Sequence, residues 1–137
     1  MAERIQLDVI TPERRLLSET VDAVTVPGLN GELGILPGHT PLISQLRTGV
    51  LSYTQGTATR RLMVSGGFVE ISDERVSVLA DIAERPEEVD AARARQEREL
   101  AEREMSSFAG SEEEMAQVRD RFERSTARLQ LAADNPR

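Results

Sequence analysis

The feature that most constrains the fold is a change in sequence character at Pro86. Before this residue, short runs of alternating apolar and polar residues are separated by glycine and proline, which is typical of β-strands and turns. After it, glycine and β-branched residues become rare and Ala, Glu and Arg dominate, which is typical of helices. The sequence therefore predicts an α+β protein, with a β-domain over residues 1–85 and a helical domain over residues 86–137.

Six short strands are expected in the first domain. In the first of them Ile5, Leu7 and Val9 alternate with polar residues, so one face is buried. The expected strands cover residues 4–10, 21–26, 49–54, 61–65, 68–72 and 75–80. Turn sequences such as Asn30-Gly31 and Gly66-Gly67 separate them. Many short strands at this spacing favour a sandwich or a barrel over a parallel sheet.

The second domain is expected to be a two-helix hairpin. Pro86 suits the first position of a helix that runs to about Ser106. Ala109-Gly110 offers a turn, and Ser111 followed by Glu114 fits a capping box that opens the second helix. Two helices alone bury little apolar surface, so the hairpin is expected to be the marginally held part of the chain.

The helix faces follow from residue spacing. The spacing predicts i, i+4 ion pairs on the solvent side of the first helix, namely Arg95/Glu99, Arg98/Glu102 and Glu99/Arg103. The second helix has an apolar stripe in which Ser125 is the weak point and whose members are Met115, Val118, Phe122, Leu129 and Ala132.

Composition excludes several classes of function. The chain has no cysteine, its 17 basic residues are all arginine, and its net charge is −7. These features argue against thiol chemistry, a P-loop, Schiff-base catalysis and nucleic-acid binding. No metal-ligand spacing is present, and His39, the single histidine, is interpreted as a polar turn residue. No apolar run approaches 18 residues, so membrane association is expected only through a partner.

The most unusual stretch is GELGILPGHTPL, residues 31–42. Its three glycines and two prolines fix the backbone, while its leucines and isoleucine supply apolar anchors. It is expected to be a rigid loop, which serves either as a sheet corner or as a docking surface.

This stretch, with three others in the same order, resembles the epsilon subunit of the F-type ATP synthase, called delta in mitochondria. The other stretches are residues 6–12, 65–71 and 78–81, and an alanine-rich hairpin completes the match. The resemblance implies a ten-stranded β-sandwich that binds the gamma subunit and rests on the ring of c subunits. It implies a role in coupling proton-driven rotation of the ring to the central stalk. By the same resemblance, Glu32 and His39 face the polar loops of the ring.

The resemblance also implies a non-catalytic, regulatory subunit. In bacteria it would be peripheral to the inner membrane, on the cytoplasmic side. The folded hairpin would permit turnover in both directions, whereas a hairpin extended along gamma would reach the alpha and beta subunits and block ATP hydrolysis. The second helix carries Arg119, Arg121, Arg124 and Arg128, which form either a basic patch for acidic partner segments or an ordinary solvated face.

A regulatory ATP site is a further implication. In bacterial relatives, a motif matched here by residues 90–94 forms part of a site where the hairpin binds ATP without hydrolysing it. The matching positions are Glu84, Asp90, Arg93, Arg124 and Arg128. The alternative is an internal network in which Asp90 pairs with the arginines. Leu100 stands where the family site has a further arginine, so any ATP affinity is expected to be weak.

Two other classes of function compete with this interpretation. One is a free-standing sandwich that binds a ligand or peptide and uses the hairpin as a dimerisation arm. The other is a hydrolase with Glu32 or Asp81 as its acid or base. Co-purification with gamma and the absence of turnover by the isolated chain would separate the first interpretation from these two.

Overall fold

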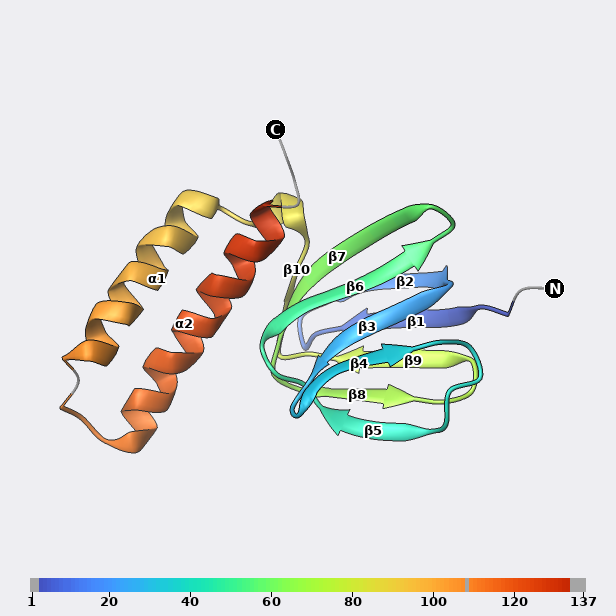
Figure 1. Ribbon diagram of the computed structural model, residues 1–137, viewed down its shortest axis with the longest axis horizontal. Coiled ribbons are helices and arrows are strands. Elements are labelled where there is room, and N and C mark those ends of the chain that lie inside the picture. The colour runs from blue at the N-terminus through green and yellow to red at the C-terminus, as the bar shows by residue number, and fades with distance from the viewer. Residues whose placement is uncertain (1–2, 108, 134–137) are drawn as a thin grey trace. The chain divides into compact units, whose positions relative to one another are not determined.

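The protein is described by a computed structural model that covers residues 3–107 and 109–133. It contains two compact units, Met1–Arg85 and Pro86–Arg137. Ten strands in two sheets make up the first unit, and a 3-10 turn followed by two α-helices makes up the second (Figure 1). The expected sandwich followed by two helices is confirmed. No helix in the described ranges combines the length and the apolar character needed to cross a membrane.

The first unit is a sandwich of two five-stranded sheets. One sheet has the order β2-β1-β9-β8-β5 and the other β10-β7-β6-β3-β4. All neighbouring strands are antiparallel except β1 and β9, which are parallel. The strands are β1 (Ile5–Ile10), β2 (Arg15–Val21), β3 (Ala23–Gly28), β4 (Gly31–Ile35), β5 (Leu42–Gln45), β6 (Gly49–Gln55), β7 (Ala58–Ser65), β8 (Phe68–Ile71), β9 (Arg75–Leu79) and β10 (Ile82–Glu84).

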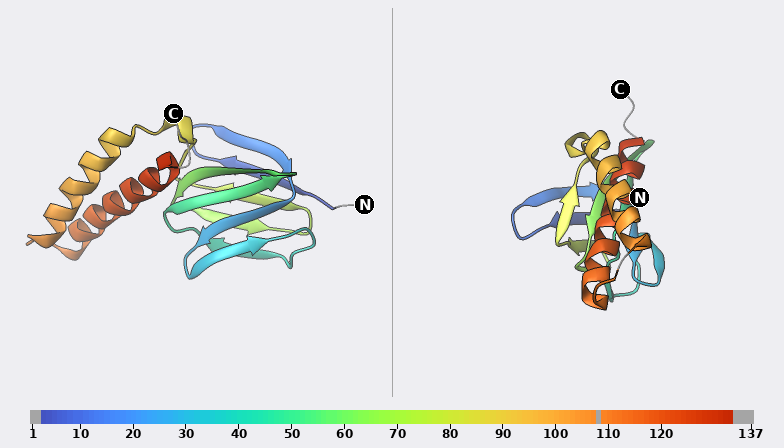
Figure 2. Two further views of the ribbon diagram at one scale, coloured as in Figure 1. Left: turned by 45° about the horizontal axis from the view of Figure 1, so that its top comes forward. Right: turned by 90° about the vertical axis from the view of Figure 1, so that its left-hand side faces the viewer.

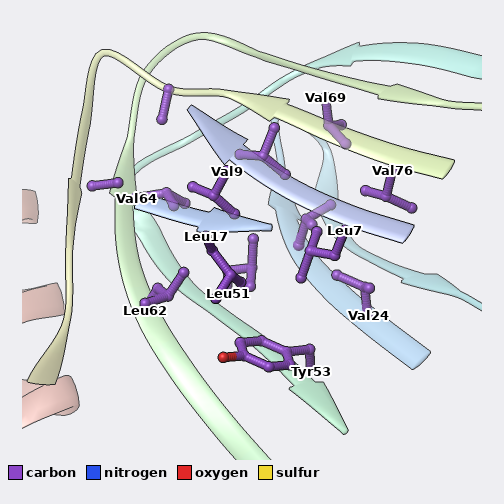
Figure 3. Close-up of a cluster of buried hydrophobic side chains, with 14 of the residues drawn as sticks. Leu7, Val9, Leu17, Val24, Leu51, Tyr53, Leu62, Val64, Val69 and Val76 are labelled. Atoms are coloured by element: carbon purple, nitrogen blue, oxygen red, sulfur yellow. The ribbon is translucent and has the colours of Figure 1, made fainter. Parts of the chain in front are cut away.

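The core lies between the two sheets. Alternate residues point inward, as the period of two requires, and Leu7, Val9 and Leu51 are completely buried. Figure 3 shows these side chains with valines and leucines from both sheets, and with Tyr53 at one end of the cluster. The Tyr53 hydroxyl donates to Glu19 at 3.2 Å, and burial, followed by the charge of Glu19, raises the pKa of Tyr53 to about 12.

Sequence periodicity missed four strands. Strand β2 was not predicted because a bulge opposite β1 buries both Leu16 and Leu17 in the core. Two consecutive buried residues break the alternation of apolar and polar residues that indicates a strand. Strand β4 is glycine-rich and was expected to be loop; β5 and β10 are very short. The strand expected over residues 21–26 is also wrong at its start, because β2 ends at Val21 and β3 begins at Ala23.

The second unit contains η1 (Pro86–Glu88), α1 (Ala91–Ser106) and α2 (Glu112–Ala133), and the two α-helices run antiparallel (Figures 1 and 2). The expectation that the first helix begins at Pro86 is wrong. Pro86 opens a separate 3-10 turn, and Asp90 caps α1 by accepting from the backbone N–H of Arg93 at 3.1 Å. The capping box is confirmed, because Ser111 Oγ accepts from the N–H of Glu114 at 3.1 Å.

Small residues form the seam between the two helices. Ala94 and Ala101 are buried on α1, and Val118 and Ser125 on α2, each pair seven residues apart and therefore on one face. Ser125, the weak point predicted in the apolar stripe, lies in this seam. Its side chain is completely buried and its hydroxyl donates to the carbonyl of Phe122 at 3.0 Å, so no polar atom is left unsatisfied.

Polar contacts between the helices come from arginines. Arg98 lies 5.3 Å from the centre of the Phe122 ring and donates to Thr126 at 3.1 Å. Arg121 pairs with Glu104 at 2.9 Å. The expected ion pairs Arg95/Glu99, Arg98/Glu102 and Glu99/Arg103 do not form among the described residues; Arg93/Glu97 is the i, i+4 pair on α1. Arg98 therefore belongs to the interface between the helices, not to the solvent side.

The turn between β7 and β8 depends on its two glycines. Gly66 and Gly67 have φ angles of 70° and 94°, in the region that favours glycine. A Cβ at Gly67 would overlap the carbonyl oxygen of Leu79 and lie 2.9 Å from the Cα of Ala80. This position therefore brings the β7–β8 turn against the end of β9, where no side chain fits.

We predict that Gly67→Ala destabilises the sandwich by about 3 kcal/mol or more, because left-handed strain and a backbone clash act together. Gly56→Ala is the matched control: its φ is 61°, but nothing lies within 4 Å of a Cβ there, so only strain of about 1 kcal/mol is expected. Urea unfolding followed by circular dichroism measures both. Equal losses of stability in the two variants would contradict the close approach.

Candidate functional site

One side of the sandwich is formed by β4 and β5, the edge strands of the two sheets, together with the loop between them. Glu32 is exposed on β4, in register with Pro27 of β3. His39 is partly exposed in the loop, and its Nδ1 lies 2.6 Å from the carbonyl oxygen of Thr40. Because a carbonyl only accepts, Nδ1 carries the proton. Glu32 and His39 do not contact each other in the described part of the chain, but both lie on this side.

The loop between β4 and β5 is fixed by backbone hydrogen bonds. The N–H of His39 donates to Leu36 at 3.2 Å, and the N–H of Gly38 donates to Asp73 in the β8–β9 turn at 3.1 Å. Large apolar side chains are nevertheless exposed here: Leu36 is 65% and Ile43 is 66% exposed. A fixed loop with exposed apolar groups suits docking better than solvent contact. The expected rigid loop is thus confined to residues 36–41, since residues 31–35 form β4.

An apolar row crosses the outer face of the sheet that contains β5. Each strand there places polar residues outward along most of its length. At one end, however, the cross-strand neighbours Phe68, Leu79 and Ile10 point outward together. Phe68 and Leu79 are each 49% exposed, and Ile43 on β5 lies one row away. We call Ile10, Phe68 and Leu79 the apolar row; Ile43 lies in the same row as Asp8.

A polar cluster occupies the next rows of the same face. Asp8 is nearly buried and its carboxylate accepts from Ser18 at 2.7 Å, from Gln6 at 3.3 Å and from Arg75 at 2.9 Å. The hydrogen bond from Ser18, aided by the one from Gln6 and by the charge of Arg75, outweighs burial and lowers the pKa of Asp8. This face therefore combines an ionised, fully satisfied carboxylate with exposed apolar groups.

The candidate nucleotide residues of the hairpin converge on a different carboxylate from the one expected. Arg93 Nε lies 3.1 Å from Glu97, and Arg128 Nη1 lies 3.5 Å from the other oxygen of Glu97. Asp90 serves as the helix cap and is not paired with the Arg93 guanidinium. The expected gathering of arginines around Asp90 is therefore wrong for Arg93. Spacing from Arg93 could have indicated Glu97, but the pairing with Arg128 requires the register of the hairpin.

The other candidate residues differ in their surroundings. Arg124 is partly exposed and has no ion pair with a described residue. Leu100 is 50% exposed on α1. Glu84 belongs to the sandwich unit, where it ends β10 in register with Met63. Of the basic patch, Arg119 is exposed, whereas Arg121 is engaged with Glu104 inside the hairpin.

Acid–base and metal chemistry find little support in the described ranges. No group of three His, Asp or Glu side chains in residues 3–107 and 109–133 is arranged to hold a metal ion. Glu32 and Asp81 are exposed, and within the same ranges neither makes a hydrogen bond to another side chain. General acid–base catalysis needs a positioned partner. The exposed surfaces described above are the β4–β5 side and the apolar row.

The sandwich and its surfaces define a class of small proteins in which a β-sandwich is followed by two helices. Residues 4–86 match the family model of the "ATP synthase, Delta/Epsilon chain, beta-sandwich domain". The epsilon chain of Syntrophobacter fumaroxidans is 40% identical over 96% of this chain and 98% of its own length. That of Carboxydothermus hydrogenoformans is 50% identical over 74% and 75%, respectively.

The chain belongs to the family of ATP synthase epsilon chains. Solved structures of ATP synthases contain chains that are similar to this one. A chain in the Euglena gracilis mitochondrial ATP synthase, described as OSCP/F1/c-ring, matches with a TM-score of 0.82 and 27% identity, covering 95% of this chain and 81% of the other. A chain in the central stalk/c-ring structure of the Tetrahymena thermophila enzyme matches with a TM-score of 0.58 at 13% identity, which shows the fold alone.

Proposed function

We propose that this chain is a non-catalytic rotor subunit of a bacterial F-type ATP synthase, peripheral to the inner membrane on its cytoplasmic side. The sandwich binds the gamma subunit and rests on the c-ring, and so couples proton translocation to ATP synthesis. The observation that carries the proposal is the pair of exposed surfaces on the sandwich, the apolar row and the β4–β5 side. Membership of the epsilon chain family, and a match to a chain of an OSCP/F1/c-ring structure, support this assignment of partners.

The apolar row is the proposed surface for gamma. Exposed aromatic and aliphatic side chains that cluster on neighbouring strands are the usual centre of an interface, and a polar rim surrounds it. Here Phe68 and Leu79 form the centre, and the satisfied cluster around Asp8 and Arg75 supplies part of the rim. All these residues precede Pro86, so the hairpin is not needed for binding.

The β4–β5 side is the proposed surface for the c-ring. Glu32 and His39 both lie on it, and the hydrogen bonds of Gly38 and His39 keep the loop rigid. A carboxylate and an imidazole suit contact with polar loops of a ring, because both form hydrogen bonds in a wet interface. The c subunits should therefore be recovered together with gamma.

We predict that the tagged full chain, isolated from native membranes, recovers gamma, alpha, beta and c subunits. Phe68→Ser with Leu79→Ser should lower the recovery of gamma at least tenfold, because both side chains at the centre of the interface are lost. Leu100→Ser is the matched control, since Leu100 is equally exposed but lies on the hairpin. A chain ending at residue 85 should bind gamma normally. Recovery of the chain alone, or self-paired, would overturn the proposal.

The hairpin is the proposed inhibitor of ATP hydrolysis, acting on the alpha and beta subunits when it extends along gamma. Its seam consists mainly of alanine and serine, which bury less apolar area than leucines would, so separating the helices costs little. Arg119 and Arg124 have no ion pair with a described residue, so they are available to acidic segments of a partner.

We predict that deleting residues 112–137 raises ATP hydrolysis by the assembled enzyme several-fold without abolishing synthesis. Arg119→Gln with Arg124→Gln should reproduce much of this effect by removing charges that face the partner. Adding Arg121→Gln and Arg128→Gln should raise ATP hydrolysis to the level of the deletion variant. Arg47→Gln with Arg60→Gln on the sandwich is the control for net charge. Hydrolysis that stays at the wild-type rate in the deletion and the fourfold variant would exclude the inhibitory role.

We also propose that the hairpin binds ATP weakly, with the phosphates held by Arg93, Arg124 and Arg128. The support is that Arg93 and Arg128 already meet at one carboxylate, and guanidinium groups that bind a carboxylate also suit phosphate oxygens. Glu97 then competes with the nucleotide. In this proposal Asp90 completes the site, and Leu100 in place of a further arginine limits the affinity.

Isothermal titration of the full chain with ATP tests this site. Glu97→Gln should tighten binding and Arg128→Ala should weaken it, whereas Arg95→Ala, a control on the exposed side of α1, should change nothing. At about a hundred times its dissociation constant, ATP should stabilise the folded hairpin by ~2.7 kcal/mol. No heat and no thermal shift at millimolar ATP would leave these arginines with an internal structural role.

A further inference from the structure

Two arginines cross between the sheets on the side of the sandwich opposite β4 and β5. There the edge strands are β2 of one sheet and β10 of the other. Arg14, just before β2, donates from Nη2 to the carbonyl of Ala83 on β10 at 3.3 Å. Arg85, just after β10, donates from Nη2 to the carbonyl of Leu16 on β2. We call this reciprocal pair of contacts the arginine latch.

The bulge in β2 makes one half of the latch possible. Val9 is opposite Leu17 and Ile10 is opposite Arg15, so Leu16 has no opposite residue on β1. A bulged residue is left out of the ladder, and the carbonyl of Leu16 accepts from Arg85 instead. The same bulge sets the register of Arg15 and of Arg14 before it. The positions of the residues that form the latch therefore depend on the register of the sheet.

The chain on the other side of Arg85 belongs to the helical unit. Pro86 opens η1, which packs against α2, and the carbonyl of Pro86 accepts from the N–H of Val89 at 3.2 Å. The division between the two compact units falls between Arg85 and Pro86. No linker therefore separates the last anchored residue of the sandwich from the first packed residue of the hairpin.

Proline restricts this junction further. The ring of Pro86 fixes its own φ near −65°, and a residue before proline is confined to extended conformations. Turning the hairpin as a rigid body therefore relies on small changes in φ and ψ of Arg85, whose side chain is held at Leu16. A hairpin that must move in its regulatory cycle consequently has a stiff pivot while the latch is closed.

We propose that the arginine latch is a conformational control for the hairpin, which rests on the regulatory role proposed above. With the latch closed, β10 stays paired to β7 and the hairpin turns about Arg85. With the latch open, β10 loses its link to β2, keeps its short pairing to β7 and the burial of Ala83, and detaches more readily. Residues 82–85 then lengthen the tether by roughly 13 Å, since an extended chain spans about 3.3 Å per residue.

Hydrogen exchange of the full chain tests the closed latch. In Arg85→Ala, and more so in Arg14→Ala with Arg85→Ala, the amides of residues 82–84 should exchange at least tenfold faster, whereas those of β1 and β9 should not change. Arg60→Ala, exposed on β7, is the matched control. Arg14→Ala alone keeps the test valid if loss of Arg85 impairs folding, because Arg14 is exposed before the strand begins. Wild-type exchange in β10 of the double variant would overturn the proposal.

A distance measurement tests the pivot. The chain has no cysteine, so spin labels can be attached at Thr57→Cys and Gln96→Cys, both exposed, without removing native thiols. The distribution of distances should broaden in the double latch variant, and also in Pro86→Gly, which frees the pivot while leaving the latch intact. Unchanged widths in both would contradict a stiff pivot. Neither measurement depends on inhibition: wild-type hydrolysis after removal of α2 would overturn the regulatory role alone.

Discussion

The packing of two five-stranded sheets around one apolar core is the interaction on which the rest of the structure depends. The chain has no disulfide, and its described residues include no metal cluster, so burial of alternate side chains must supply the stability of the sandwich. The period of two then determines the outer faces as well. Once Val69 and Val78 are inside, Phe68 and Leu79 must be outside. The exposed apolar row thus departs from the otherwise polar outer face of the sheet. A partner can cover these apolar side chains.

The two sides of the sandwich are used differently. On one, β4 and β5 are the edge strands, and a rigid loop presents Glu32 and His39. On the other, Arg14 and Arg85 satisfy carbonyl groups of β2 and β10. Exposed strand edges invite unwanted pairing, and capping their carbonyl groups removes that risk. These contacts therefore distinguish the side formed by β2 and β10 from the proposed docking side of the sandwich.

The two helices of the hairpin are held together differently from the two sheets of the sandwich. Alanine and serine at its seam allow close packing but bury little apolar area, and arginines at the margins supply the polar contacts. Contacts made by Arg98, Arg121 and Arg128 each link one helix to the other, and the two ion pairs among them weaken as salt screens them. Such an interface holds the helices in register without committing much free energy. This suits an element that is proposed to change conformation.

The sequence by itself determined the two-part architecture, the boundary at Pro86, the capping box at Ser111 and the resemblance that identifies the family, because these depend on local pattern. Only the tertiary structure decided the roles of Leu16, Ser125 and Glu97. Leu16 is displaced by a bulge, Ser125 is buried by the facing helix, and Glu97 meets Arg128 across the hairpin. Each role depends on which residue lies opposite in a neighbouring strand or helix. That register is set by packing between segments distant in sequence, which periodicity within one segment does not encode.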